Sequence, residues 1–208
     1  MRNSLLFMAV TVLTFSNSGI ATTFTFNTDP FAGTTALTTP GRQVIMNEIS
    51  IPNFSIASDT IVFDQAVFNV GPSILFASGP VESLPTSNVN MIVLLSFPTP
   101  LAAGGAADLI ANQITTDGAG FFIYFNTALN LPRLVYSTNL NDNTSDLKVL
   151  ARFTENFNGT AGQAAMANFT ASNFAINPVP EPSTLTMMSA ALGALTFGVL
   201  RRKKSSNR

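Results

Sequence analysis

The chain lacks three residue types that carry much of protein chemistry. Its 208 residues include no cysteine, no histidine and no tryptophan. Without cysteine there is no disulfide bond and no thiol nucleophile. Without cysteine and histidine there is also no Cys/His zinc site and no Ser-His-Asp triad. We therefore expect a protein that is not an enzyme of these classes and that holds no cofactor.

Charge is also scarce and is distributed unevenly. Only 10% of the residues are charged, and the formal net charge of the whole chain is −1. Residues 22–177 contain ten acidic residues but only four basic ones, so this region alone carries a charge of −6. Nucleic-acid binding depends on clustered Lys and Arg. We therefore expect no nucleic-acid partner.

The C-terminal region combines an apolar run with a basic end. No residue from Thr184 to Leu200 is charged, and the run approaches the length that a helix needs to cross a bilayer core of about 30 Å. Basic residues beside a span stay in the cytoplasm. This predicts a transmembrane helix over 184–200, a cytoplasmic tail over 201–208 and an exported region before them. The alternative is a buried core helix with a solvated tail. The residues that set the topology are Arg201, Arg202, Lys203 and Lys204.

A proline-rich motif stands immediately before this run. Pro180 and Pro182 keep the backbone extended, which suits a protease cleft. The motif Val179, Pro180, Glu181, Pro182 and Ser183, followed by the apolar run and the basic cluster, resembles a PEP-CTERM sorting signal over 178–208. The resemblance implies that exosortase, a membrane-embedded cysteine protease, recognises Pro180, Glu181 and Pro182. It also implies a Gram-negative host, of a kind that often makes extracellular polysaccharide.

The N-terminus has the pattern of an export leader. Arg2 supplies a positive start, residues 5–15 are apolar but too short to span a membrane, and small residues stand at Gly19 and Ala21. This predicts a signal peptide over 1–21, handled by the secretion translocon and cleaved after Ala21. The alternative is an N-terminal membrane anchor. The exported domain then covers 22–177.

The region 22–177 has the alternation and the turn residues of a β protein. We predict an all-β domain, an antiparallel sandwich or jelly-roll-like fold, with one or two short helices. It is also similar to uncharacterised PEP-CTERM proteins at 27–31, 120–126 and 131–137. The expected helices cover 106–114 and 160–168, and the expected strands cover 22–26, 43–51, 61–70, 91–97, 121–125, 134–136, 147–153 and 174–176.

One loop is rich in side-chain oxygens. It offers Asn139, Asn141, Asp142, Asn143 and Asp146, and Ca²⁺ takes six to eight oxygen ligands. The alternative is a turn between two strands in which these side chains bond to their own backbone. Because the glycine and the final glutamate of an EF-hand are missing, the pattern favours the turn over a metal site.

Several functions are compatible with these features. The leading hypothesis is a structural or interaction protein of the envelope or extracellular matrix, held by its C-terminal helix in membrane lipid until exosortase processes it. One alternative is a carbohydrate-binding module for extracellular polysaccharide. The other is a glycoside hydrolase with paired carboxylates, although the acidic residues are scattered along the chain. These include Asp29, Glu48, Asp59, Asp64, Glu82, Asp108, Asp117 and Glu155.

Overall fold

The computed structural model describes residues 20–95 and 102–179. Most of the predicted leader, the predicted helix over 184–200 and the basic residues 201–208 lie outside these ranges. Within the described residues, no helix is long and apolar enough to cross a membrane. The chain division into 1–21, 22–177 and 178–208 therefore stays a prediction.

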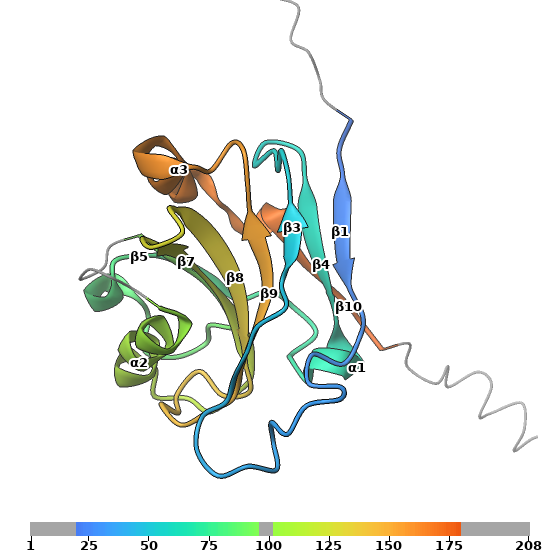
Figure 1. Ribbon diagram of the computed structural model, residues 1–208, viewed down its shortest axis with the longest axis vertical. Coiled ribbons are helices and arrows are strands. Elements are labelled where there is room, and N and C mark those ends of the chain that lie inside the picture. Colours follow the sequence, from blue (N-terminus) through green and yellow to red (C-terminus); the bar gives the residue numbers. More distant parts are fainter. Residues whose placement is uncertain (1–19, 96–101, 180–208) are drawn as a thin grey trace, which may run out of the picture.

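The domain is built from two β-sheets and three α-helices within the described residues (Figure 1). The smaller sheet has the order β1-β4-β10, and the larger has the order β2-β9-β8-β7-β6-β5, with β3 also paired to β9. The strands of the two sheets are β1 Thr23–Phe26, β2 Val44–Ile45, β3 Ile49–Ile51, β4 Thr60–Asp64, β5 Phe76–Gly79, β6 Met91–Leu94, β7 Gly120–Asn126, β8 Leu131–Ser137, β9 Leu147–Phe153 and β10 Phe174–Asn177. The helices are α1 Gln65–Phe68, α2 Ala103–Gln113 and α3 Gly159–Ala165, with short 3₁₀ turns at Val81–Ser83, Met166–Asn168 and Ala171–Asn173.

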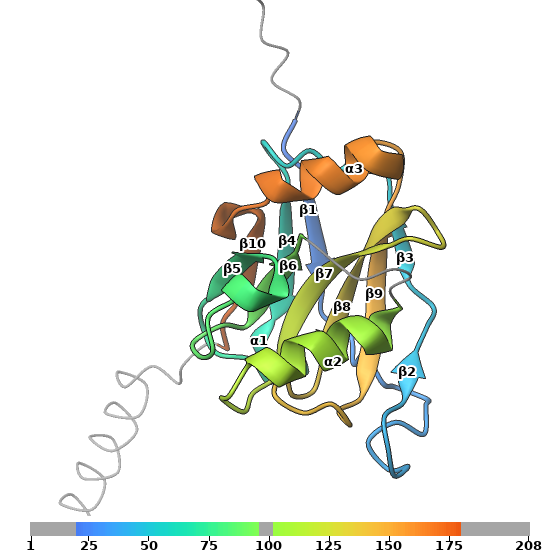
Figure 2. The ribbon, with the colours of Figure 1, turned by 90° about the vertical axis from the view of Figure 1, so that its left-hand side faces the viewer.

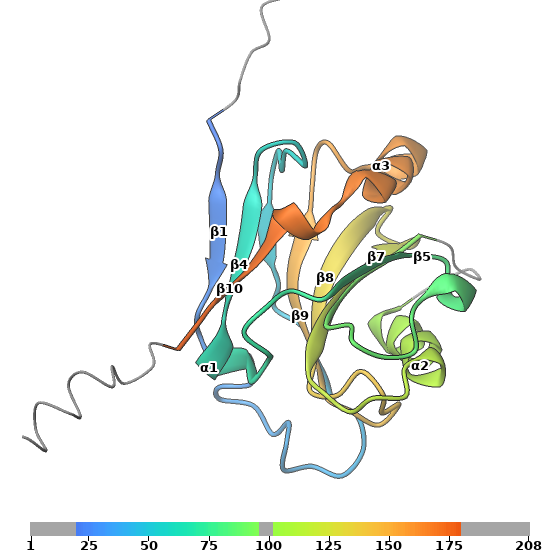
Figure 3. The same ribbon diagram turned by 180° about the vertical axis from the view of Figure 1, so that it is seen from behind.

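The larger sheet is buried on both faces. Every residue of β6 and β7 is buried, because successive side chains enter different cores. Phe121 and Ile123 pack toward the smaller sheet, whereas Phe122 and Tyr124 pack toward α2. Figure 2 shows α2 lying across the outer face of the larger sheet, and Figure 3 shows the smaller sheet covering the opposite face. The domain thus has three layers, which are sheet, sheet and helix.

Phenylalanine fills the core between the two sheets. The Phe63 ring of β4 stacks on Phe121 of β7, with centroids 3.7 Å apart and planes 14° apart. A second group centres on Phe54, whose ring lies 5.4 Å from Phe153 and 5.7 Å from Phe169. Aromatic pairs in these geometries add to the stabilisation from burial alone. The core is therefore held by packed aromatic rings, in a chain that has no cysteine.

The prediction of a mostly β, two-sheet domain with short helices is confirmed, but its antiparallel pairing is wrong. Among the strands that the structure describes, β7–β8 and β8–β9 are antiparallel and the other six pairings are parallel. Parallel neighbours need long crossover connections. The chain supplies one between β6 and β7, where α2 crosses the sheet. Alternation along a strand is the same for either direction, so the sequence pattern did not reveal the parallel pairs.

Individual elements agree with the sequence predictions except at three places. The predicted strand 43–51 is divided into β2 and β3, because Asn47 between them has a positive φ of 81° that interrupts the extended backbone. The predicted strand 61–70 ends at Asp64, whose Oδ1 accepts hydrogen bonds from the N–H groups of Ala66 and Val67 and so starts α1. Strand β5 was not predicted, because its Phe-Ala-Ser-Gly sequence has little strand character. The two expected helices appear as α2 and as α3 with the 3₁₀ turn that follows it.

The stacked pair of Phe63 and Phe121 gives a test of the core. We expect Phe63→Ala to lower the free energy of unfolding by about 3–5 kcal/mol, because a fully buried ring is replaced by a cavity. Urea unfolding of the exported domain measures this. Leu129→Ala is the control, since Leu129 is 48% exposed and its loss is expected to change stability by less than about 0.5 kcal/mol. Equal losses in the two variants would contradict the assigned core.

Candidate functional site

The start of the proline-rich segment leaves the domain at its last strand. β10 ends at Asn177, and Asn177, Pro178 and Val179 are all exposed. The Val179 N–H donates a hydrogen bond to Oε1 of Gln65, the first residue of α1, at 3.1 Å. The predicted motif residues from Pro180 onward and the basic residues 201–204 lie outside the described residues. The last described residues therefore lead from the surface of the domain directly into the motif.

The oxygen-rich loop joins β8 to β9, and most of its side chains bond to nearby backbone or to one another. Asn139 Oδ1 accepts hydrogen bonds from the N–H groups of Gly118 and Asn141, at 3.1 and 3.0 Å. Asp142 Oδ1 accepts bonds from the N–H and the hydroxyl of Thr144, at 2.7 and 2.8 Å. These are the bonds of Asx turns. Asn143 is exposed at the tip.

Asp146 points away from the rest of the loop. It is 8% exposed, and its two carboxylate oxygens accept hydrogen bonds from the N–H groups of Leu37 and Gln43, both at 2.7 Å. The carboxylate therefore holds the long connection between β1 and β2 against β9. Within the described residues, no three acidic side chains lie close enough together to hold a metal ion.

Hydrogen bonds lower the pKa values of two carboxylates in this region, Asp117 and Asp142. Bonds from the Asn139 and Asn141 side chains lower the pKa of Asp117, although burial and the nearby Asp142 carboxylate oppose them. Bonds from Thr144 lower the pKa of Asp142. A general acid needs a raised pKa. This pair therefore has the electrostatics of a solvated, hydrogen-bonded turn.

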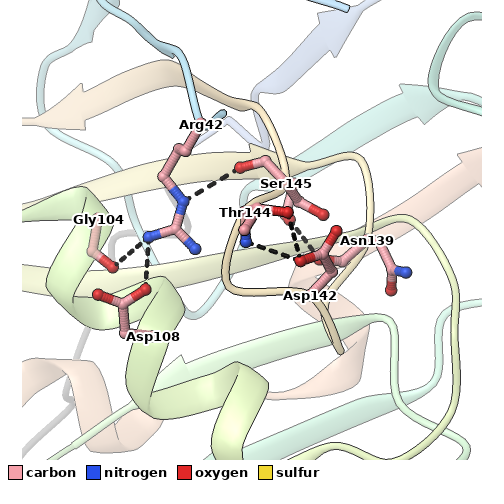
Figure 4. A network of polar contacts seen from close by, with 8 residues as sticks. Arg42, Gly104, Asp108, Asn139, Asp142, Thr144 and Ser145 are labelled. Atoms are coloured by element: carbon pink, nitrogen blue, oxygen red, sulfur yellow. Dashed lines mark hydrogen bonds and ion pairs between the residues drawn. The ribbon is translucent and has the colours of Figure 1, made fainter. Parts of the chain in front are cut away.

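Arg42 ties the loop to α2 (Figure 4). Its Nε donates to the Ser145 carbonyl at 3.1 Å, and one terminal nitrogen donates to the Gly104 carbonyl at 2.9 Å and to Asp108 at 2.6 Å. Gly104 and Asp108 belong to α2, while Ser145 belongs to the loop. The arginine thus positions three segments and leaves the loop little freedom to rearrange around a ligand.

A cleft opens where the two sheets part, between the end of β1 and strands β3 and β9. Its volume is about 270 Å³. Phe26, Phe68 and Leu150 form its apolar part. Its polar side chains come from three separate segments and include Thr28, Asp29, Asn47 and Lys148. Sequence analysis did not predict this site, because nothing in the local pattern shows that these segments meet.

Two neighbouring groups adjust the electrostatics of the cleft. Burial lowers the pKa of Lys148, although Glu48 partly opposes this, and its Nζ donates to the Met46 carbonyl at 2.8 Å. Burial, with the nearby Asp29 carboxylate, raises the pKa of Tyr136 to about 12. The Tyr136 hydroxyl therefore stays protonated and donates to the Phe68 carbonyl at 2.8 Å. The cleft itself is lined by the Asp29 carboxylate and the Lys148 amino group, together with aromatic rings.

Glu48 lies next to the cleft, but its carboxylate already forms an ion pair with Arg133. The paired nitrogen and oxygen atoms are 2.6 Å apart, and both side chains are largely buried. Burial alone would raise the pKa of Glu48, but a hydrogen bond with its own backbone and the positive charge of Arg133 lower it overall. This ion pair fixes the segment between β2 and β3 against β8.

Comparison with known proteins identifies the C-terminal segment. The family described as the PEP-CTERM protein-sorting motif matches residues 178–203, so the sequence prediction for this segment is confirmed. No curated protein and no solved structure matches the chain. The similarity of the central domain to uncharacterised PEP-CTERM proteins therefore stays a prediction.

The position of Asp146 leads to a prediction about stability. We expect Asp146→Asn to lower the free energy of unfolding by about 1–3 kcal/mol, because the new amide NH₂ would face one of two backbone donors. Urea unfolding measures the loss. Asn143→Ala is the matched control at the exposed tip of the same loop, and little change is expected there.

Calorimetry with Ca²⁺ separates the turn from a metal site. We expect no saturable heat at millimolar calcium, since Asp146 faces Leu37 and Gln43 and the Asp142 oxygen is bonded to Thr144. Heat that saturates in the original chain and disappears in Asp146→Asn would contradict this interpretation.

Proposed function

We propose that this chain, which carries a PEP-CTERM sorting signal at residues 178–203, is an exported protein whose β domain has a structural or interaction role at the cell envelope or in the extracellular matrix. The motif supports recognition by exosortase and delivery to the cell surface. The observation that carries the proposal is the match itself, which begins one residue after the last strand of the domain.

The order of segments suits this route. The leader directs the chain into the translocon, and the charge-free run over 184–200 retains it in the inner membrane. The basic residues after the run stay in the cytoplasm. The domain then folds outside, with the extended Pro-Glu-Pro segment between it and the membrane. The two prolines of the motif favour an extended backbone. The residues just before them, 177–179, are exposed on the domain surface. Both features support access by a membrane-embedded protease.

We propose a role in binding or structure rather than catalysis. Within the described residues, the carboxyl groups with shifted pKa values are Glu48, Asp117 and Asp142, and all three shifts are downward. Glycoside hydrolysis needs one carboxyl that holds its proton near neutral pH. Asp108 is paired with Arg42, and Asp64 caps α1. The carboxylates of Asp108 and Asp64 thus stabilise the fold, which supports a non-catalytic role.

Carbohydrate binding at the cleft is a second candidate. Saccharides are bound by aromatic faces together with hydrogen-bonding side chains, and the cleft combines Phe26 and Phe68 with Asp29, Asn47 and Lys148. Its volume suits a single sugar unit better than a large ligand. The charge of residues 22–177 favours neutral or basic saccharides over polyanions.

Replacing the motif tests the sorting route. We expect the protein from its native host to lose the C-terminal segment when exosortase is present and to keep it when exosortase is absent. Replacing Pro180, Glu181 and Pro182 with alanine is expected to give the unprocessed mass in both strains. Intact-mass spectrometry measures this. Glu155→Gln, which changes an acidic residue inside the domain, is the control and is expected to be processed normally. Identical masses with and without exosortase would contradict the route.

The cleft proposal has its own test. We expect glycan-array binding by the exported domain to fall at least tenfold in Lys148→Met, because the ammonium donor is lost while the length of the side chain is kept. Arg152→Met is the matched control, since Arg152 lies on the same strand, is exposed and does not line the cleft. Equal binding by the two variants, or none by the original domain, would exclude a saccharide site at this position.

A further inference from the structure

Thr22 is the first described residue that is hydrogen-bonded to the rest of the domain, and its partner is a buried carboxylate. The Thr22 N–H donates to Asp59 Oδ1 at 2.9 Å, and the Thr22 carbonyl accepts a bond from the Thr60 N–H at 3.0 Å. The residues immediately before it project outward, with Ile20 95% exposed and Ala21 exposed. The boundary between exposed chain and bonded chain therefore falls between Ala21 and Thr22, where the sequence predicts cleavage.

Asp59 is well held but has no cationic partner. It is 5% exposed, and besides Thr22 it accepts hydrogen bonds from the Ser55 N–H at 2.9 Å and the Ser58 hydroxyl at 3.1 Å. Within the described residues the ion pairs are Arg42 with Asp108 and Arg133 with Glu48, and neither includes Asp59. A buried carboxylate is costly unless it is paired or fully hydrogen-bonded.

We propose that removal of the leader creates the missing partner, so that the new α-ammonium group of Thr22 forms an ion pair with Asp59 that the precursor cannot form. In the cleavage, a signal endopeptidase adds water across the Ala21–Thr22 peptide bond. The Ala21 carbonyl carbon takes the oxygen and becomes a carboxylate, and the Thr22 nitrogen becomes an ammonium group. This inference rests on the export leader that the proposed function requires.

The geometry favours a net gain from this pair. The donor nitrogen is already at hydrogen-bond distance, so no rearrangement is needed. Thr22 is exposed, which leaves the other ammonium protons in water and avoids most of the desolvation cost of a buried pair. Hydrogen bonds in which both groups are charged are stronger than those in which one group is neutral.

The pair would act on one edge of the smaller sheet. Within the described part of the chain, β1 is an edge strand that pairs only with β4, in parallel register from Thr23 opposite Thr60 to Phe26 opposite Phe63. Asp59 stands immediately before β4, so its bond to Thr22 secures β1 at the first position of that register. Cleavage thus stabilises the docked strand after export, while the precursor holds β1 less firmly.

The test compares two chains that run from Thr22 to Arg208 in detergent, one with a free amino terminus and one acetylated on the Thr22 nitrogen. Acetylation removes the charge but keeps one N–H donor, which reproduces the chemistry of the precursor. We expect acetylation to raise the equilibrium constant for unfolding about five- to tenfold at neutral pH, and we expect this difference to shrink in about 1 M salt. Equal stability of the two chains would overturn the proposal.

Substitution of the acceptor identifies the partner. In Asp59→Asn the two chains are expected to be equally stable, whereas in the control Asp64→Asn the effect of acetylation is expected to persist, because Asp64 caps α1 at the far end of β4. An acetylation effect that survives in Asp59→Asn would overturn the assignment. If Asp59→Asn does not fold, hydrogen exchange at Phe24 and Phe26 in the two unsubstituted chains decides, with slower exchange expected for the free amine.

N-terminal sequencing of the protein from its native host completes the test and is expected to give Thr22 as the first residue. Another first residue would overturn the proposal even where exosortase processing occurs. Loss of exosortase processing with Thr22 still at the start would instead reject the sorting route alone.

Discussion

The structure depends on a sheet that is apolar on both faces. β6 and β7 are entirely buried, and their side chains alternate between two hydrophobic cores. Such a sheet must be covered twice, and the chain does this with the smaller sheet on one face and α2 on the other. The helix is also the crossover that lets β6 and β7 run parallel. Burial of both faces of the larger sheet therefore explains the three layers, and the covering helix also allows β6 and β7 to run parallel.

Several of the few carboxylates in this chain accept hydrogen bonds from the main chain. Asp29, Asp59, Asp64, Asp142 and Asp146 each accept at least one hydrogen bond from a main-chain N–H group. A carboxylate can accept several such bonds, so one side chain satisfies donors that no strand or helix would pair. These five carboxylates lie at turns and segment ends that need a cap, which explains part of the scattering of acidic residues along the sequence.

Both ends of the domain belong to the smaller sheet. β1 and β10 flank β4 and run parallel to it, so the start of β1 and the end of β10 lie at opposite ends of that sheet (Figure 1). The predicted leader precedes the first strand and the sorting motif follows the last. Each of the two terminal segments is thus attached to an edge strand of the smaller sheet.

The sequence by itself determined the sorting signal, because that signal is a linear order of proline-rich motif, apolar run and basic cluster. It also determined the β class and most strand positions, since alternation and turn residues are local. Strand direction, the two-sided burial of the larger sheet, the cleft beside Lys148 and the bond between Thr22 and Asp59 were decided by tertiary structure. Each of these joins segments far apart in the chain, and no local pattern records which distant segments become neighbours.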